Sequence, residues 1–330
     1  MGGLLNRELA LNIGLVIFSL LFSLVVIELL LRGVGFEYPP RCPDCIEDEE
    51  LRFTRQYFFE NVSMFMADNP DIVFMGDSCT QWTNYDGMLV SMLEAETHRE
   101  VISWMDAGVE AYSIDQGLLQ FDLHVKALHP KVIFIYFGWN DHHYGVVSDS
   151  DFQRLRKNIR TVSHVEIRNL KLLHLASYLY SRMIALGNDE VYTVRVTKDE
   201  FRDKLALLVS GAKGEGITPV LITAPTPIHE DDEVYWIPES PYDNTRQMLA
   251  RHDEYAQIVR DVSIEHDVLL CDILADLRDL REEEGEEVWD YFEIDGVHPT
   301  QPKGSRKVAE MLRDCVTKDN DLMARLTSDA

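Results

Sequence analysis

Short apolar runs alternate with longer amphipathic stretches over most of this chain. Five of the runs are rich in branched and aromatic residues and are bounded by turn-forming residues, so we predict that they are buried strands. The predicted strands are Ile72–Met75, Val101–Trp104, Val132–Phe137, Val220–Thr223 and Val268–Cys271. The stretches between them carry helical patterns, notably Ile114–Leu128, Lys198–Lys213, Thr245–His266 and Pro302–Val316. This alternation predicts an α/β fold in which helices cover both faces of a parallel sheet.

A mostly apolar stretch near the N-terminus, Leu11–Leu31, is 21 residues long. Because a helix rises about 1.5 Å per residue, this length spans the hydrocarbon core of a membrane. Glu28 lies one helical turn before Arg32, so the two charges can neutralise each other near the interface. The alternative is a cleavable signal peptide, but residues 29–36 fit poorly to the small-residue cleavage site that it requires. We expect an uncleaved anchor in a single-pass membrane protein.

These patterns divide the chain into four parts. The expected parts are a membrane anchor over residues 1–35, a lead-in over 36–69, an α/β domain over 70–318 and a C-terminal tail over 319–330. Two segments of the domain, 145–197 and 225–247, are longer than simple connections require. Both leave the carboxyl ends of predicted strands, where ligands bind in open α/β folds, so we expect them to form walls around a substrate.

Acidic residues outnumber basic ones, with 57 Asp and Glu against 31 Lys and Arg and a net charge of −26. Such a field repels phosphate groups, so we expect no nucleic-acid partner. One part of the segment 145–197 is locally basic. Its basic residues are Arg154, Arg156, Lys157, Arg160, Arg168 and Lys171. This stretch is either a solvated helix face that pairs with neighbouring acids or a surface for anionic lipid headgroups or an anionic glycan.

The five cysteines leave two readings open. Cys42 and Cys45 follow the apolar stretch closely and can form a small disulfide in an oxidising compartment, or they can remain free thiols. A zinc site would require a second pair of ligands nearby, and the sequence has none there. Cys79 follows a serine, and we expect its side chain to point into the core.

Ser78 directly follows the predicted strand Ile72–Met75, at the carboxyl edge of the sheet. A serine hydroxyl becomes a useful nucleophile only when a base takes its proton. His298 is the candidate base, because Asp295 lies three residues earlier and can fix its tautomer by a hydrogen bond. Taken alone, this Asp-x-x-His pattern also fits a contact at the start of a helix, since Pro299 follows.

An acyl-transfer site also needs hydrogen-bond donors for the oxyanion. We expect these donors to be the backbone N–H groups of Ser78 and Gly108 and the side-chain amide of Asn140. Gly108 and Asn140 each follow a predicted strand, so all three donors should meet at one edge of the sheet. Asp77 and Asp141 are expected to support the site, with Asp77 ordering the turn by side-chain-to-backbone hydrogen bonds.

Four sequence blocks carry these residues in a fixed order. The blocks are Gly76-Asp77-Ser78, Gly108, Gly138-Trp139-Asn140-Asp141 and Asp295-Gly296-Val297-His298-Pro299. Over roughly residues 70–318 they resemble the SGNH hydrolases, or GDSL esterase/lipase family, although Cys79 stands where the family name has leucine. The resemblance implies a three-layer α/β/α sandwich with a flavodoxin-like, five-stranded parallel sheet. It also implies a location beyond the membrane, as for many bacterial members.

The resemblance implies a serine esterase that works through an acyl-enzyme and needs no cofactor. We expect no metal, because the adjacent His142 and His143 rarely face one ion. The substrate is expected to be a small-molecule ester, an O-acetylated glycan or a lipid ester. Aromatic side chains for a sugar-stacking or acyl surface are Trp82, Trp139, Tyr144 and Trp236, each of which can equally be core. Two alternatives stay open, an O-acetyltransferase that uses the same site and a non-catalytic binding protein at the membrane.

Overall fold

The computed structural model describes residues 2–36, 45–46, 54–66, 69–145, 148–151, 171–172, 175, 179 and 193–327. The chain forms two compact units. One unit contains Met1–Pro43 and Arg154–Val191, and the other contains Asp44–Gln153 and Tyr192–Ala330. The second unit holds every residue that the sequence assigns to the site.

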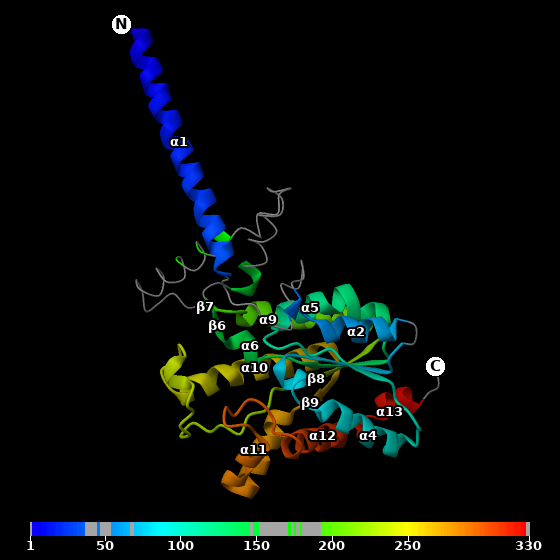
Figure 1. Ribbon diagram of the computed structural model, residues 1–330. Helices are drawn as coiled ribbons and strands as arrows, with labels where there is room; N and C mark the ends of the chain where they lie inside the picture. The colour runs from blue at the N-terminus through cyan, green and yellow to red at the C-terminus, as the bar shows by residue number, and fades with distance from the viewer. Residues whose placement is uncertain are drawn as a thin grey trace. The chain divides into compact units, whose positions relative to one another are not determined.

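A five-stranded parallel sheet forms the centre of this second unit (Figure 1). Its strands are β3 (Ile72–Gly76), β4 (Trp104–Asp106), β5 (Val132–Tyr136), β8 (Thr218–Ile222) and β9 (Leu269–Cys271). They lie in the order β4-β3-β5-β8-β9, and each pairs with its neighbour in parallel. In chain order this is the flavodoxin-like arrangement of a doubly wound sheet. The predicted five-stranded parallel sheet is confirmed.

Both faces of the sheet are buried. In β3, Ile72 and Phe74 belong to one apolar cluster, whereas Val73 and Met75 belong to a second cluster on the opposite face, and all four are 0% exposed. This division follows from the alternation of side chains along a strand. It also explains why the strands are continuously apolar, as a sheet covered on both sides requires.

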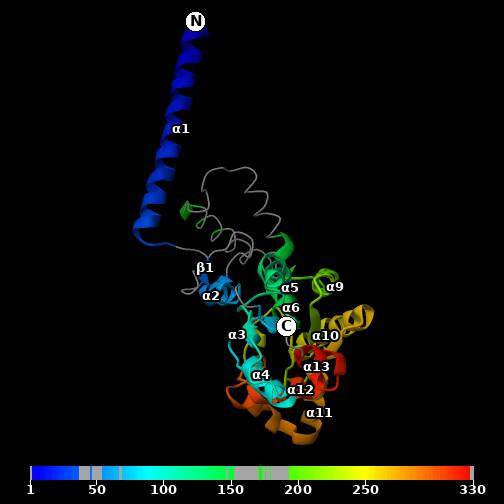
Figure 2. The same ribbon diagram turned by 90° about the vertical axis from the view of Figure 1, so that its right-hand side faces the viewer.

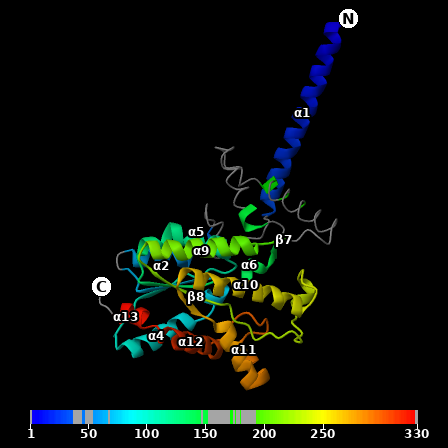
Figure 3. The ribbon, with the colours of Figure 1, turned by 180° about the vertical axis from the view of Figure 1, so that it is seen from behind.

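Helices cover the two faces separately, as Figure 3 shows. On one side lie α2 (Gln56–Phe65), α5 (Ile114–Gln120), α9 (Lys198–Gly214) and α10 (Thr245–His266). On the other side lie α4 (Tyr85–Thr97), α12 (Lys303–Val316) and α13 (Asn320–Thr327). The helix α4 packs against both α12 and α13 (Figure 2). The layers are therefore helix, sheet and helix.

The remaining elements of the described chain are short, apart from α1 and α11. They are α1 (Gly2–Gly33), α3 (Ser78–Gln81), α6 (Trp139–His142), α11 (Ile273–Glu284), β1 (Cys45–Ile46), β2 (Thr54–Arg55), β6 (Tyr144–Gly145) and β7 (Thr193–Val194). A π-helical turn (Phe121–Val125) and a 3-10 turn (Lys126–Leu128) continue α5, and two further 3-10 turns span Ile237–Glu239 and Gly285–Tyr291.

Local capping explains where several helices begin. Thr197 and Glu200 form a capping box at the start of α9, and Asn244 caps α10 by accepting from the N–H of Gln247. Each cap satisfies backbone N–H groups that have no partner within the helix. These signals account for the close agreement between the predicted and observed starts of α9 and α10.

The second strand begins later than the sequence predicts. The predicted strand was Val101–Trp104, but Val101 is 68% exposed and pairing with β3 starts at Trp104. Parts of the expected lead-in and tail also contribute to the core. Phe58 of α2 is fully buried, as are Leu322 and Leu326 of α13. The packed unit therefore extends beyond the apolar runs of the sheet in both directions.

The helix α1 is long and apolar enough to cross a membrane. Its segment Gly14–Gly33 has a mean hydropathy of 2.7 and is not buried, properties that anchors share with signal sequences. The predicted pair of Glu28 and Arg32 forms, with 2.7 Å between the carboxylate and the guanidinium Nε. The same carboxylate accepts hydrogen bonds from the N–H groups of Lys171 (3.0 Å) and Leu172 (2.9 Å).

A disulfide that the sequence did not predict joins Cys271 in β9 to Cys315 in α12. It ties the edge of the sheet to a helix 44 residues further along the chain. Cys79 is a buried free thiol, as expected. Cys42 and the side chain of Cys45 lie outside the described residues, so the predicted pairing of these two stays a prediction.

Gly304 in the first turn of α12 offers a test of this packing. A Cβ atom there would lie 1.8 Å from the carbonyl oxygen of Tyr291, so the backbone would have to move. We expect Gly304→Ala to lower the free energy of unfolding by about 1–3 kcal/mol, the usual cost of overpacking, in urea titrations. The matched control is Gly214→Ala at the end of α9, where no atom lies within 4 Å. Gly214→Ala should leave the free energy of unfolding unchanged or raise it. Equal losses of unfolding free energy in both variants would contradict the close packing of Gly304 against Tyr291.

Candidate active site

Ser78 lies at the carboxyl end of β3, where the chain turns sharply into α3. A Cβ atom at Gly76 would lie 2.2 Å from the hydroxyl oxygen of Thr80, so this turn requires glycine. Asp77 caps α3, because its Oδ1 accepts a hydrogen bond from the N–H of Cys79 at 2.9 Å. The turn therefore fixes Ser78 as the first residue of a short helix at the edge of the sheet.

His298 joins Ser78 to Asp295 in a continuous chain of hydrogen bonds. The Oγ of Ser78 is 2.8 Å from Nε2 of His298, and Nδ1 of His298 is 2.6 Å from Oδ2 of Asp295. A carboxylate only accepts, so Nδ1 carries the proton and Nε2 of the neutral imidazole accepts from the serine hydroxyl. This is the geometry of a Ser–His–Asp triad.

Asp295 is held by its own loop. Its Oδ1 accepts hydrogen bonds from the N–H groups of Val297 (2.8 Å) and His298 (3.0 Å), and its carbonyl accepts from Nε1 of Trp236 (2.9 Å). Burial acts to raise the pKa of Asp295, but the hydrogen bonds from His298 and Val297 outweigh it and hold the pKa below its usual value. The carboxylate thus stays ionised while His298 carries a proton.

Asn140 approaches the same edge from α6, which follows β5. Its Nδ2 donates to Oδ2 of Asp77 at 3.0 Å, so Asp77 holds both α3 and the amide. Asp77 is fully buried, and burial raises its pKa. Asp141 faces elsewhere, because its Oδ1 accepts from the N–H of Ile114 at 2.8 Å at the start of α5. Asp77 therefore contacts both Asn140 and the turn at Ser78 directly, whereas Asp141 holds the start of α5.

Residues 74–304 match the model of the GDSL-like lipase/acylhydrolase family. The chain belongs to this family. Lipoprotein YqeF of Bacillus subtilis strain 168 is 25% identical over 264 residues, which cover 74% of this chain and 88% of that protein.

Two solved structures are similar in fold. A Parabacteroides merdae protein described as a GDSL-like lipase has a TM-score of 0.51 and 15% identity, covering 76% of this chain and 97% of its own. The lipase/acylhydrolase of Enterococcus faecalis has a TM-score of 0.49 and 17% identity, covering 79% of this chain and 100% of its own. The first of these similarities shows a shared α/β fold.

Gly108 lies beside α3, but its N–H already donates a hydrogen bond within the protein. The N–H donates to Oδ1 of Asp106 at 2.7 Å, and the carbonyl accepts from the hydroxyl of Tyr57. A Cβ atom at Gly108 would lie 2.7 Å from the backbone nitrogen of Gln81, which explains the glycine. Burial raises the pKa of Asp106. The close approach of Gly108 is thus to the helix that begins at Ser78.

Ala111 is a residue that no sequence pattern selects. Its φ is +62°, in the left-handed region that alanine rarely adopts. The turn before Ala111 lies along the segment Gly76–Gln81. The N–H of Val109 donates to the carbonyl of Gly76 (3.0 Å), and the N–H of Glu110 donates to the side-chain oxygen of Gln81 (2.6 Å). Within residues 107–113, all described, the N–H of Ala111 alone has no protein acceptor.

The four aromatic candidates separate into distinct roles. Trp82 is 49% exposed, and its ring lies 4.9 Å from that of His298, centroid to centroid. Trp236 holds the carbonyl of Asp295. Trp139 is buried and stacks on His252 at 4.1 Å, and Tyr144 packs against the ring of Tyr242. Trp82 is the one of the four that combines exposure with contact to the triad.

His142 and His143 both lie in protein surroundings. The two ring nitrogens of His142 are 2.7 Å from the hydroxyl of Tyr242 and 3.1 Å from Nδ1 of His252. Burial lowers the pKa of His142 well below its usual value and that of His143 to about 4. The imidazole of His142 is thus a neutral, hydrogen-bonded part of the core.

A cavity of about 590 Å³ lies near the loop of Asp295 but does not include the triad. Thr226 and Ile228 line it, and both contact Gly296, since Thr226 donates to the carbonyl of Gly296 at 2.8 Å. Ser78, His298 and Asp295 do not line this cavity, and the ring of His298 lies beside the exposed ring of Trp82.

Asp141→Asn tests the burial of Asp141, whose pKa is raised to about 7 by burial and by the nearby charges of Asp149 and Asp77. Between about pH 4 and pH 7 the folded state keeps a proton that the unfolded state has lost, so stability falls as the pH rises. Asparagine still accepts from Ile114 and has no such proton. We expect the Tm of the variant, relative to the wild type, to increase from about pH 4.5 to about pH 8. A constant difference would mean that Asp141 titrates normally.

Proposed function

We propose that this protein is a serine esterase that hydrolyses carboxylic esters through an acyl-enzyme. The observation that carries the proposal is the hydrogen-bonded chain from Ser78 through His298 to Asp295. Membership of the lipase/acylhydrolase family supports the same reaction class. The chemistry requires no cofactor.

In the first half of the reaction, Oγ of Ser78 attacks the ester carbonyl carbon while Nε2 of His298 takes the hydroxyl proton. His298 then gives that proton to the alcohol oxygen as the bond to the acyl group breaks. In the second half, His298 takes a proton from water, the hydroxide attacks the acyl carbon, and Ser78 leaves with its proton restored. The ionised Asp295 stabilises the imidazolium in both halves.

Three donors are proposed for the oxyanion. The N–H of Ser78 stands at the N-terminus of α3, and Asn140 has a second amide hydrogen beyond the one that Asp77 holds. Gly108 was the expected third donor, but its N–H donates to Asp106. We therefore propose the N–H of Ala111 for this role and assign Gly108 to the packing of the turn against α3. Losing one such donor typically costs about 100- to 1,000-fold in kcat.

The exposed ring of Trp82 supports a proposal for the substrate class. A half-exposed indole beside the histidine base provides a flat apolar surface on which a sugar ring or an acyl chain can stack. We propose an O-acetylated glycan or a lipid ester as the substrate. The segment 225–247 contributes to the site through Trp236, whereas most of the segment 145–197 lies outside the described residues, with its proposed role as a wall.

We also propose that Leu11–Leu31 is an uncleaved anchor and that the catalytic unit lies outside the cytoplasm. The length and hydropathy of α1 support the anchor. The disulfide between Cys271 and Cys315 supports an oxidising compartment, since structural disulfides are rare in reducing ones. The relative in Bacillus subtilis is named a lipoprotein, which agrees with a location at the outer face of a membrane.

Substitution of the triad tests the reaction. Full-length protein in detergent should hydrolyse p-nitrophenyl acetate, butyrate or octanoate. Ser78→Ala and His298→Ala should each lower kcat by about 10⁴-fold or more, because they remove the nucleophile or the base. Asp295→Asn should lower kcat by about 10⁴-fold, because the amide holds His298 in the wrong tautomer and does not stabilise the imidazolium. KM should change little, and circular dichroism should confirm folding. Activity that survives Ser78→Ala would contradict the serine mechanism.

The same assay separates hydrolysis from acyl transfer to a sugar. Addition of an acceptor glycan should leave the rate of acid release unchanged for an esterase. Accumulation of an O-acetylated glycan in place of free acid, read by mass spectrometry, would instead favour the O-acetyltransferase. A folded wild type without either product would leave the binding-protein alternative.

Fractionation of cells tests the anchor. A protein with an N-terminal tag should remain in the membrane pellet after alkaline carbonate washing and should keep the tag, because the apolar helix is not cleaved. Protease added outside intact cells should digest the catalytic unit, and a cytoplasmic protein serves as the control. Release of a soluble, untagged protein would show that the helix is a signal peptide.

A further inference from the structure

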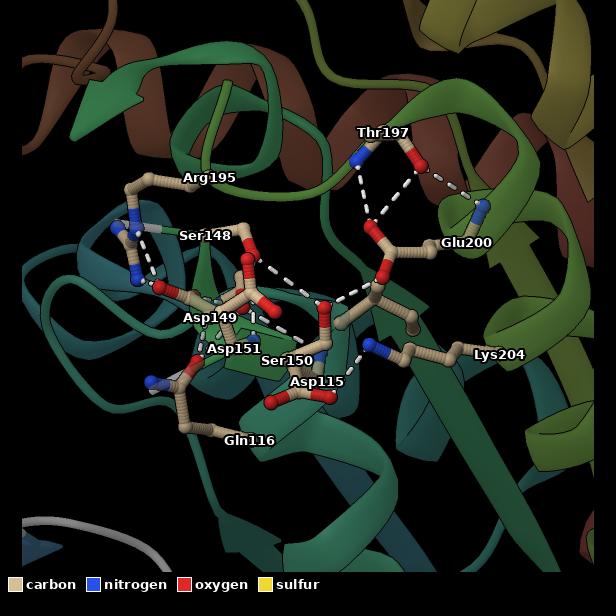
Figure 4. Close-up of polar contacts among 12 residues, drawn as sticks. Asp115, Gln116, Ser148, Asp149, Ser150, Asp151, Arg195, Thr197, Glu200 and Lys204 are labelled. Atoms are coloured by element: carbon tan, nitrogen blue, oxygen red, sulfur yellow. Dashed lines mark hydrogen bonds and ion pairs between the residues drawn. The ribbon is translucent and has the colours of Figure 1, made fainter. Parts of the chain in front are cut away.

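A buried ion pair lies beside the turn of Ala111. Nη2 of Arg195 is 2.8 Å from Oδ2 of Asp149, and Nε is 3.3 Å from Oδ1, so the two groups meet through both oxygens (Figure 4). The side chains are 15% and 5% exposed. Removing two charges from water costs about as much as their attraction returns, so a pair of this kind is weak evidence for stability. A role in holding geometry is the better explanation.

The pair holds the turn of Ala111 at two points. The same Nη2 of Arg195 donates to the carbonyl of Ala111 at 2.9 Å. Oδ2 of Asp149 also accepts from the hydroxyl of Ser113 at 2.7 Å, and Ser113 caps α5. We call Arg195 and Asp149 together the turn clamp. Residues on both sides of Tyr112 are thereby fixed to one rigid ion pair.

Fixing the carbonyl of Ala111 matters because of its backbone. A left-handed alanine costs about 1 kcal/mol or more relative to a right-handed one, so the turn needs an external contact to keep this conformation. Rotation of the peptide between Ala111 and Tyr112 would break the hydrogen bond from Arg195 to the carbonyl of Ala111. Such a rotation changes φ and ψ of Ala111 and would therefore also move its N–H. The clamp thus restrains the left-handed backbone of Ala111, the residue in this turn whose N–H has no protein acceptor.

The clamp itself is anchored by the backbone. The N–H of Asp149 donates to the carbonyl of Arg195 (2.8 Å), and the N–H of Arg195 donates to the carbonyl of His143 (2.8 Å). Next to these bonds, β6 pairs with β7. The two chain segments that flank residues 152–192 are therefore joined to each other at the clamp.

We propose that Arg195 and Asp149 are positioning residues that hold the left-handed conformation of Ala111 so that its N–H stabilises the oxyanion. This inference rests on the proposed function and adds two residues to it that touch neither the substrate nor the triad. The clamp acts through the turn, so its loss should weaken binding of the transition state more than binding of the substrate.

The test compares Arg195→Met with the wild type in full-length protein. We expect kcat on p-nitrophenyl acetate to fall about 10- to 100-fold with KM within about threefold, because the donor is displaced rather than removed. The affinity for a boronic acid, which forms a tetrahedral anion on the serine, should fall by a similar factor. Arg195→Lys should recover part of the loss, since an ammonium group keeps the positive charge and donates hydrogen bonds but lacks the planar fork of the guanidinium.

A second buried ion pair in the same cluster provides the matched control. Nζ of Lys204 lies 2.6 Å from Oδ1 of Asp115, near the start of α5, and touches neither Ala111 nor Asp149 (Figure 4). Lys204→Met should lower Tm without lowering kcat. If Arg195→Met does not fold, the near-isosteric Asp149→Asn takes its place, with an expected fall in kcat of about 3- to 10-fold.

The outcomes separate the clamp from the proposed function. An active wild type whose clamp variants keep kcat and boronate affinity, or lose only Tm, would overturn the clamp. A folded wild type that neither hydrolyses esters nor labels with a fluorophosphonate at Ser78 would overturn the proposed function and the clamp with it. An active wild type with a selective loss of kcat and boronate affinity in Arg195→Met, but not in Lys204→Met, would establish the clamp.

Discussion

The parallel pairing of β3 with β4 and β5 is the constraint on which the site depends. Because the three strands run in one direction, their carboxyl ends bring Gly76, the turn after Asp106 and the start of α6 to the same edge. The pairing continues past β4, where the N–H groups of Ala107 and Val109 donate to Phe74 and Gly76. A shift of one residue in this register would move the turn of Ala111 away from Ser78 and exchange the two buried faces of the strands.

Asp77 converts that edge into a site. The fully buried carboxyl group of Asp77 accepts from the N–H of Cys79 with one oxygen and from the amide of Asn140 with the other. It thereby links the turn at Ser78 to Asn140 through one side chain. The cost of burying it appears as a raised pKa. His298 lies 220 positions further along the chain than Ser78. The loop that carries His298 is ordered by Asp295, which accepts hydrogen bonds from the N–H groups of Val297 and His298.

The sequence predicted those parts that depend on residue type and periodicity. Continuous apolar runs located the five strands, and the predicted helix Thr245–His266 has the observed bounds because Asn244 and a left-handed Asp267 terminate it. The structure also brings Ser78, His298 and Asp295 together by hydrogen bonds and Asn140 onto Asp77, while the catalytic roles of these residues stay predictions. Ala111, Arg195 and the Cys271–Cys315 disulfide were not selected, since each depends on backbone conformation or on partners distant in sequence.

The missed residues share a physical reason. A glycine in a sequence indicates that a left-handed backbone is possible, whereas an alanine gives no such signal. The hydrogen bond that offsets the strain at Ala111 comes from the side chain of Arg195, 84 positions away. The ion pair of Arg195 and Asp149 is buried, and a buried pair is expected to add little net stability once desolvation is counted. A positioning role is the better explanation for the pair, because an N–H donor stabilises a developing charge only when the backbone that carries it is held before the reaction begins.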